Sequence, residues 1–546
     1  MEKGKRERIV SNILLAVLLI IGIMVRIYHW PNGLNAVNCD EAMSAINAKA
    51  IADYGKDIYG TSYPVYFEAW QEGGQSAFLI YTMALCIKIF GFSIFSVRLP
   101  MLLISILALI ITYDFAKRIF KDKKIALVIL AFLVINPWQI MQARWSLDCN
   151  MFPHLTLISI YLLYLGITKK KWMIYLSMIF FGFTMYTYGV AIYFIPVLLL
   201  ILGIYFVIKK RITGKELALC IVIYLLISFP IYLMGIINIF HLETIHLGPF
   251  TIQYFDKSVR TSDMFLFSEN KLETLTANIQ SLFTVLVKQK DGLPANYVPG
   301  FGTTYPISIL FFIFGFLSLW LLKEEKVEKG LEKIEEETKK EKDLSNERIG
   351  KNILMLWLFL SLILGILINN TNINRLNIIW YPIIFITGYG IYEFYYLLRK
   401  KRTKIILGSF LILFFSISFT LFEIRYFTKH TQTIENSKLW SNGLIQAIWS
   451  VKEEAEVIHI TDDLYGKGIE TYIKFASDFD LSYYLGEKKE NNPSFWEKYK
   501  VEKIQKYDNP EDAYIIKKRE LNNANLKLEE YDYQEFQNYI VLRKKL

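Results

Sequence analysis

Apolar residues gather in long runs along the chain. Typical runs cover residues 9–25, 99–113, 125–141, 190–208 and 405–420, each about 15–19 residues long. With their flanks, runs of this length match the hydrocarbon thickness of a bilayer, whereas the buried helices of soluble domains are usually shorter. The pattern therefore predicts an all-α polytopic membrane protein.

Basic clusters orient the predicted spans, because Lys and Arg accumulate in the cytoplasmic loops of membrane proteins. The clusters are residues 3–8, 117–124, 169–171, 209–215, 323–351 and 399–404. Placing all of them in the cytoplasm gives about eleven spans: 9–28, 98–116, 125–142, 153–168, 172–187, 190–208, 216–237, 305–322, 352–368, 377–397 and 405–421. The N-terminus is then cytoplasmic and the C-terminus lies outside. No small-residue cleavage site follows the first run, so we expect an uncleaved first span.

Several segments outside the predicted spans are long enough to fold or to carry function. They are outer loop 1 (28–97), a second outer loop (238–305), a cytoplasmic loop of alternating Lys and Glu (323–351) and the tail (422–546). The apolar run 76–91 is short, and counting it as a span would move the basic cluster 117–124 outside. It therefore reads as an interfacial helix on the outer surface.

The tail alternates strand-like stretches (457–460, 513–516 and 539–542) with a helix-like one (469–477), which is typical of a small α/β domain. We therefore expect a transmembrane domain over residues 1–421 and an extracytoplasmic α/β domain over residues 422–546. The loop 323–351 reads as a solvated helix or a linker.

Composition and charge narrow the functional classes. The chain is 53% hydrophobic and carries a net charge of +10, which positively charged cytoplasmic loops explain without a nucleic-acid partner. Ionisable residues inside the spans are few and lie near the ends: Arg26, Asp114 and Glu393. Because proton- and ion-coupled transporters need charged groups near mid-membrane, this scarcity weakens a transporter interpretation.

The sharpest candidate for chemistry is Asp40 with Glu41, just outside the first span. A carboxylate near lipid headgroups can act as a general base or bind a cation. The competing interpretation is structural, because an acid before the helical stretch 42–51 is also typical of a helix N-cap. The pattern alone leaves both open.

Two further outer segments carry charged candidates. Arg144 and Asp148 lie between two predicted spans, on the same side as Asp40. Arg375 lies between two later spans, at the predicted outer end of a helix. A guanidinium can hold a phosphate through paired hydrogen bonds. The alternatives are a helix cap for Asp148 and interface anchoring for the two arginines.

A set of short motifs follows in a fixed order: Asp40-Glu41, Phe90-Gly91-Phe92, Arg98-Leu99-Pro100, Tyr113–Phe120 (YDFAKRIF), Asn136-Pro137, Ala143-Arg144 with Asp148, and Arg375 with Trp380-Tyr381-Pro382. No single motif is specific, but their order resembles that of the GT-C class of membrane glycosyltransferases. It is most similar to the protein O-mannosyltransferase and aminoarabinose-transferase branch (family 39-like). The resemblance is good over about residues 10–170 and 370–395, and only topological in between.

The resemblance implies an inverting transfer of one sugar from a polyprenyl-phosphate donor to a hydroxyl acceptor at the outer face of the plasma membrane. The acceptor is a cell-envelope glycan, a lipid or a protein. The implied catalytic residues are Asp40, as general base, and its neighbour Glu41. The implied donor-phosphate or substrate ligands are Arg98, Arg144, Asp148 and Arg375. The chain departs from the family at 71–77, where Gln-Glu-Gly-Gly-Gln-Ser-Ala replaces a Pro-Pro-Leu that helps to shape the donor site, so the sugar is not implied.

Other functions and partners stay open at this point. The alternative is a lipid-linked oligosaccharide ligase, polymerase or flippase, and a third class is a membrane anchor for the tail. No cofactor is expected. A divalent metal stays open but is not indicated, because no ligand cluster is evident and His241 and His246 are poorly spaced as a pair. A disulfide between Cys39 and Cys149 is possible if their loops meet, although coincidence is the simpler explanation.

Overall fold

The molecule divides into two units that alternate along the sequence. The structure is a computed structural model that describes residues 2–70, 72–256, 268–321, 334–461, 467–477, 480, 493–521 and 526–545. Unit 1 comprises residues 1–28, 101–235 and 260–426, and unit 2 comprises residues 29–100, 236–259 and 427–546.

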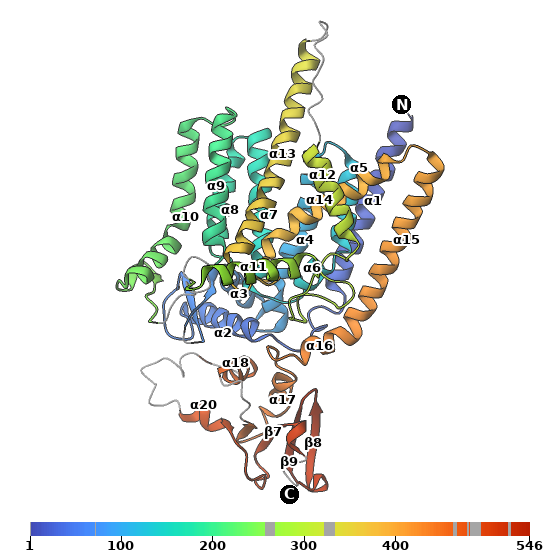
Figure 1. The fold of residues 1–546 in the computed structure, drawn as a ribbon. Helices are drawn as coiled ribbons and strands as arrows, with labels where there is room; N and C mark the ends of the chain where they lie inside the picture. Colours follow the sequence, from blue (N-terminus) through green and yellow to red (C-terminus); the bar gives the residue numbers. More distant parts are fainter. Residues whose placement is uncertain are drawn as a thin grey trace. The chain divides into compact units, whose positions relative to one another are not determined.

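Unit 1 is built from long helices that run side by side, with α11 lying crosswise to them (Figure 1). Two of the helices, α4 and α10, pass into unit 2 at one end. The helices are α1 (Glu2–Ile27), α4 (Ile94–Ile119), α5 (Lys123–Val134), α6 (Pro137–Gln142), α7 (Asp148–Thr168), α8 (Trp172–Thr184), α9 (Ala191–Ile208), α10 (Gly214–Phe240), α11 (Lys271–Leu286), α12 (Ser308–Leu321), α13 (Ile334–Leu367), the 3₁₀ turn η3 (Asn377–Ile379), α14 (Trp380–Leu397) and α15 (Lys401–Arg425).

Among the residues described, 7 helices are long and apolar enough to cross a membrane. They lie in α1, α4, α7, α9, α10, α13 and α15, and α8 and α12 are shorter apolar helices. This confirms the prediction of an all-α polytopic membrane protein. The count of about eleven spans stays a prediction, as does the side of the membrane on which each loop lies.

Helices α12 and α14 cross at a pair of glycines, Gly315 and Gly390. A Cβ added to Gly315 would lie 2.2 Å from the carbonyl oxygen of Ile386, and one added to Gly390 would lie 2.0 Å from that of Phe311. Because neither glycine has a side chain, the two backbones can approach this closely, as small residues allow in membrane helix pairs.

Unit 2 contains the predicted first outer loop, residues 236–259 and the tail. Its loop elements are α2 (Cys39–Tyr54), the hairpin β1 (Tyr66–Ala69) and β2 (Glu72–Ser76), α3 (Ala77–Phe90), and the hairpin β3 (Ile245–Leu247) and β4 (Phe250–Ile252). Helix α3 is the short apolar helix that the sequence predicts at the interface. It packs against α2.

The tail forms a five-stranded mixed sheet with small helices. Its elements are the π-helical turn η4 (Tyr426–His430), α16 (Thr431–Glu435), α17 (Leu444–Val451), β5 (Ile458–Thr461), α18 (Lys467–Ala476), α20 (Pro493–Lys498), β6 (Tyr499–Glu502), β7 (Ala513–Lys517), α21 (Lys518–Leu521), η6 (Leu528–Glu530), β8 (Tyr531–Phe536) and β9 (Tyr539–Lys544). The strand order is β6-β5-β7-β9-β8, with β5 parallel to both neighbours and β9 antiparallel to both of its own. The central strand β7 is buried along its whole length. The predicted α/β tail is therefore confirmed.

The units do not follow the predicted domain boundary in full. The chain passes into the tail part of unit 2 after Tyr426, close to the predicted boundary at 421–422. However, unit 2 also includes residues 29–100, which the prediction placed in the transmembrane domain. Of the charged loop 323–351, residues 334–351 begin α13, and residues 323–333 lie outside the described residues.

Candidate active site

Asp40 lies in the first turn of α2, and a neighbouring residue caps this helix. The N-cap is Asn38, whose side-chain oxygen accepts a hydrogen bond from the backbone N–H of Asp40 at 3.0 Å. Glu41 completes a capping box by accepting from the backbone N–H of Asn38. Capping therefore does not account for Asp40, although its carboxylate still benefits from the positive end of the helix dipole.

The hairpin β1–β2 approaches Asp40 from a second side. The indole N–H of Trp70 donates to the Asp40 carboxylate at 3.4 Å, and the amide of Gln75 donates to the Asp40 carbonyl at 3.0 Å. Gln75 is 5% exposed, and its own side-chain oxygen has no hydrogen-bond partner among the described residues. This hairpin contains residues 71–76 of the stretch 71–77, where the sequence departs from the family pattern, and residue 71 lies outside the described part.

Glu41 is bound by Arg98 in a fully buried ion pair. The Arg98 Nε and Nη2 each lie 2.9 Å from a different oxygen of the Glu41 carboxylate. The remaining N–H groups of Arg98 donate to the carbonyls of Pro31 at 2.8 Å, Leu34 at 2.7 Å and Ala36 at 3.0 Å. All five N–H groups of a guanidinium are thereby used.

This network fixes the loop that leads into α2. Arg98 lies near the start of α4, and the carbonyls that it binds belong to residues 31–36, directly before the N-cap. A buried ion pair is stable only when its remaining donors and acceptors are satisfied, and here the loop carbonyls supply that. In this geometry both carboxylate oxygens of Glu41 bind the guanidinium of Arg98. The catalytic role implied for Glu41 and the phosphate role implied for Arg98 stay predictions.

Arg144 lies in unit 1, against the end of the first helix. Its guanidinium donates to the carbonyls of Arg26 at 3.2 Å and Val25 at 3.4 Å, in the last turn of α1, where the helix dipole favours a cation. The ring of Tyr426 lies 6.0 Å from the guanidinium carbon. The electrostatic field of Glu423 acts on both Arg144 and Arg26.

Asp148 begins α7 and contributes to its first turn. Its carboxylate accepts from the backbone N–H of Cys149 at 2.7 Å, and Leu147 at the N-cap position provides no side-chain cap. The helix therefore begins at Asp148, earlier than the predicted start near residue 152. Asp148 is therefore the first helical residue and not the N-cap, although its carboxylate accepts from one of the N–H groups that a helix start leaves without a partner inside the helix.

Arg375 lies in a loop that a half-buried acid holds in place. The Arg375 guanidinium donates to the carbonyl of Asn369, and its backbone N–H donates to the Asn372 side chain at 2.8 Å. The carboxylate of Asp291 accepts from the backbone N–H of Ile373 at 3.0 Å. Burial raises the pKa of the Asp291 carboxyl, although these hydrogen bonds oppose the shift.

Asn377 joins the Arg375 loop to the start of α7. Its side-chain amide donates to Gln142 at 2.8 Å, to the carbonyl of Cys149 at 3.1 Å and to Asn150 at 3.0 Å. Its oxygen accepts from the indole N–H of Trp138 at 2.6 Å. The Arg375 loop, α6 and the start of α7 thereby meet around one buried amide. We did not single out Asn377 from the sequence, although it ends the polar run 369–377.

The candidate residues fall into two groups. Unit 2 brings together Asp40, Glu41 and Arg98, and unit 1 holds Arg144, Asp148 and Arg375. Within the described ranges no three His, Cys, Asp or Glu side chains are arranged to hold a metal ion. His241 and His246 hydrogen-bond instead to hydroxyls of their own hairpin region, and the cysteines are free thiols.

Known proteins share the fold of this chain. The family model described as dolichyl-phosphate-mannose-protein mannosyltransferase matches residues 75–234. The crystal structure of ArnT from Cupriavidus metallidurans bound to undecaprenyl phosphate is similar at a TM-score of 0.53 and 13% identity, covering 97% of this chain and 97% of ArnT. No curated protein matches the sequence.

A second similar structure is the archaeal oligosaccharyltransferase AglB from Archaeoglobus fulgidus, in complex with an inhibitory peptide and a dolichol-phosphate. Its TM-score is 0.51 at 13% identity, and the alignment covers 99% of this chain and 74% of AglB. Identities this low show the fold alone. The chain therefore has the GT-C fold of these membrane glycosyltransferases, as the ordered motifs predict.

Proposed function

We propose that this protein is an inverting glycosyltransferase that moves a sugar from a polyprenyl-phosphate donor to a hydroxyl acceptor at the outer face of the membrane. The fold and the matched family model support a glycosyltransferase. The bound undecaprenyl phosphate of ArnT and the dolichol-phosphate of AglB support a lipid-phosphate carrier. In this proposal the N-terminus is cytoplasmic and the tail extracytoplasmic.

The observation that carries the proposal is the separation of roles between two adjacent acids. The Asn38 side chain caps α2 and the Glu41 carboxylate is bound by Arg98, so the cap and the buried ion pair use side chains other than that of Asp40. Asp40 would accept the proton of the acceptor hydroxyl while that oxygen forms a bond to the anomeric carbon. The bond from this carbon to the phosphate oxygen breaks on the opposite face, so the configuration inverts and polyprenyl phosphate leaves.

The leaving phosphate needs fixed positive partners as its charge develops. We assign this role to Arg144 and Arg375, with Asp148 orienting the donor or Arg144. We assign Arg98 and Glu41 to support of the Asp40 loop, because every N–H of Arg98 is already bound within unit 2. In this proposal, positioning together with general base catalysis can perform the transfer without a metal.

The test is a donor panel in vesicles that contain the full chain. Polyprenyl-phosphate monosaccharides and polyprenyl-linked oligosaccharides are supplied with candidate acceptors, and release of the lipid phosphate and the anomeric configuration of the product are measured. The proposal expects one monosaccharide donor to be consumed with inversion. Consumption of oligosaccharide donors alone would favour a ligase or polymerase. Movement of a donor across the bilayer without bond cleavage would favour a flippase.

A further inference from the structure

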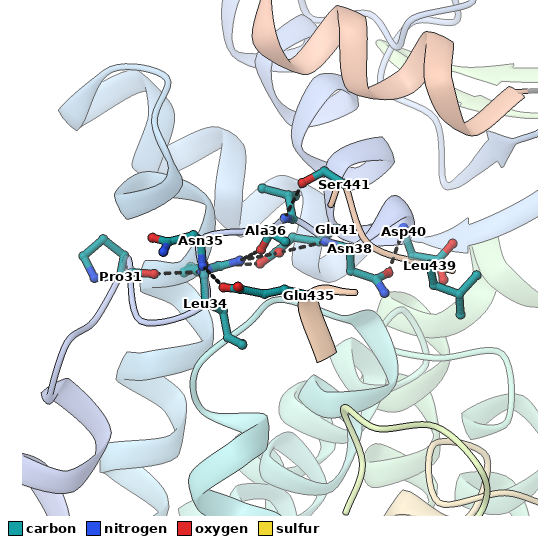
Figure 2. A network of polar contacts seen from close by, with 12 residues as sticks. Pro31, Leu34, Asn35, Ala36, Asn38, Asp40, Glu41, Glu435, Leu439 and Ser441 are labelled. Carbon is teal, nitrogen blue, oxygen red and sulfur yellow. Dashed lines mark hydrogen bonds and ion pairs between the residues drawn. The ribbon is translucent and has the colours of Figure 1, made fainter. Parts of the chain in front are cut away.

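Two segments about 400 residues apart in the sequence are joined next to Asp40 within unit 2. The tail segment, residues 435–441, runs antiparallel to the chain that leads into α2 (Figure 2). The backbone N–H of Ser441 donates to the carbonyl of Val37 at 2.9 Å, and the Ser441 hydroxyl oxygen accepts from the N–H of Val37 at 3.1 Å. Both residues are almost fully buried.

The tail segment also completes the hydrogen bonding at the start of α2. The first N–H groups of any helix have no partner inside the helix. Asn38 satisfies the N–H of Asp40, whereas the N–H of Cys39 donates to the carbonyl of Leu439 at 2.8 Å. The same carbonyl accepts from the hydroxyl of Tyr472 in α18 at 3.1 Å. A tail backbone group therefore supplies one of the bonds that hold the turn on which Asp40 lies.

Glu435 links the loop to the tail sheet. One oxygen of its carboxylate accepts from the backbone N–H of Asn35 at 2.7 Å, and the other accepts from the amide of Gln537 at 2.5 Å. Gln537 lies in the turn between β8 and β9, and Glu435 is 6% exposed. A carboxylate that receives two hydrogen bonds at a buried site fixes both partners more firmly than a neutral acceptor does.

We propose that the tail segment positions Asp40 for proton transfer, with Glu435 and Ser441 as the positioning residues. This inference rests on the proposed function, in which Asp40 is the general base. A general base must lie within hydrogen-bond reach of the proton that it removes, and displacements of about 1 Å cost on the order of 100-fold in rate. The tail domain would thus contribute to catalysis by holding Asp40 in position.

The kinetic test uses the full chain with Glu435→Ala and Ser441→Ala. Because positioning acts on the chemical step, each variant should lose about tenfold or more in kcat while KM for the lipid donor stays within about twofold. Ser441→Thr keeps the hydroxyl and should restore kcat. Matched controls are Glu535→Gln, in an exposed pair with Lys518, and Ser450→Ala, whose hydroxyl bonds within α17.

Hydrogen exchange provides a readout that does not depend on activity. Peptides covering residues 35–42 should exchange faster in Glu435→Ala and Ser441→Ala than in wild type and in the two control variants. Wild-type kcat together with wild-type exchange in both variants would overturn the proposal, and so would a loss confined to donor KM. If Asp40→Asn retains full activity, the proposed function fails instead, and the exchange result still reports whether the tail segment holds the loop.

Discussion

The carboxylate of Glu41 and the guanidinium of Arg98 lie 2.9 Å apart, and neither side chain is exposed to solvent. Removing two charges from water is costly, and their attraction offsets the cost only when the remaining donors are also satisfied. Here three loop carbonyls complete the shell of Arg98. The pair therefore fixes the loop before α2, and this loop determines where Asp40 lies.

Arg98→Lys should destabilise the protein strongly. An ammonium has three donors and no planar fork, so it cannot bind both carboxylate oxygens and three carbonyls. We expect a loss on the order of 3–5 kcal/mol, as for other buried pairs that lose a partner. Thermal unfolding in lipid nanodiscs measures it. Arg118→Lys, in the partly exposed pair with Asp114 on the same helix, is the control and should shift Tm little. Equal shifts in the two variants would contradict the role of Arg98.

Arg375→Gln should weaken transfer if this arginine holds the donor phosphate. Loss of a charge-assisted hydrogen bond in the transition state lowers kcat/KM by about tenfold or more. Steady-state kinetics with the active donor measure the effect, and Arg399→Gln, in a predicted cytoplasmic cluster, is the control. An unchanged kcat/KM would mean that Arg375 only anchors the chain at the membrane interface, which is the alternative role given for it above.

Asp57→Asn should stabilise the protein above pH 6 and change little near pH 4. Burial raises the pKa of Asp57 to about 6, because it outweighs hydrogen bonds from the backbone of Thr61 and Tyr59, and Glu68 adds to the rise. The folded state thus binds a proton that the unfolded state releases near pH 4, so wild type loses stability as the pH rises toward 6. Asparagine keeps the acceptor oxygen without the charge.

The measurement for Asp57→Asn is Tm in nanodiscs at pH 4.5 and pH 8. The gain in free energy of unfolding of the variant over wild type, obtained from the Tm values, should be larger at pH 8 than at pH 4.5 by on the order of 2 kcal/mol. Asp53→Asn, in an exposed pair with Lys49, is the control and should show no such growth. A gain equal at both pH values would show that the carboxyl of Asp57 is not neutral in the folded protein.

Gly390→Ala should disrupt the crossing of α12 and α14. The added Cβ would lie 2.0 Å from the carbonyl oxygen of Phe311, which is backbone and cannot rotate away. We expect loss of folded protein in detergent, measured by size-exclusion chromatography. Gly235→Ala is the control, because an added Cβ there meets nothing within 4 Å, and alanine favours a helix. Comparable yields from both variants would contradict the close backbone contact.

The sequence predicts the spans and the tail strands because each depends on a local pattern. Long apolar runs produce the long helices such as α9, and the stretch 513–516 becomes the buried central strand β7. The shorter apolar helices α8 and α12 show why the span count stays open, since length alone does not decide it.

The start of α2 has a local signal in the sequence. Asn38 and Glu41 are three residues apart, which is the spacing of a capping box. The competing interpretation assigned the cap to Asp40 because Asp and Asn are equally good caps. Read with that spacing, the sequence already favours Asn38 as the cap.

The partners of the candidate site had no local signal. Glu435 contacts the loop at Asn35, and Asn377 contacts the helix start at Cys149 and Asn150. These contacts join residues hundreds of positions apart, and no periodicity or spacing in one sequence specifies them. The same reason explains why the grouping of residues 29–100 with the tail was not predicted.

The assignment of Asp40 as the general base is tested by a comparison of three proteins. Wild type, Asp40→Asn and the same-helix control Asp53→Asn are assayed for release of polyprenyl phosphate from the active donor, with folding checked by Tm. If Asp40 removes the proton, Asp40→Asn loses activity by at least about 100-fold at an unchanged Tm, while Asp53→Asn keeps its activity. Equal turnover by Asp40→Asn and wild type would show that Asp40 is not the general base.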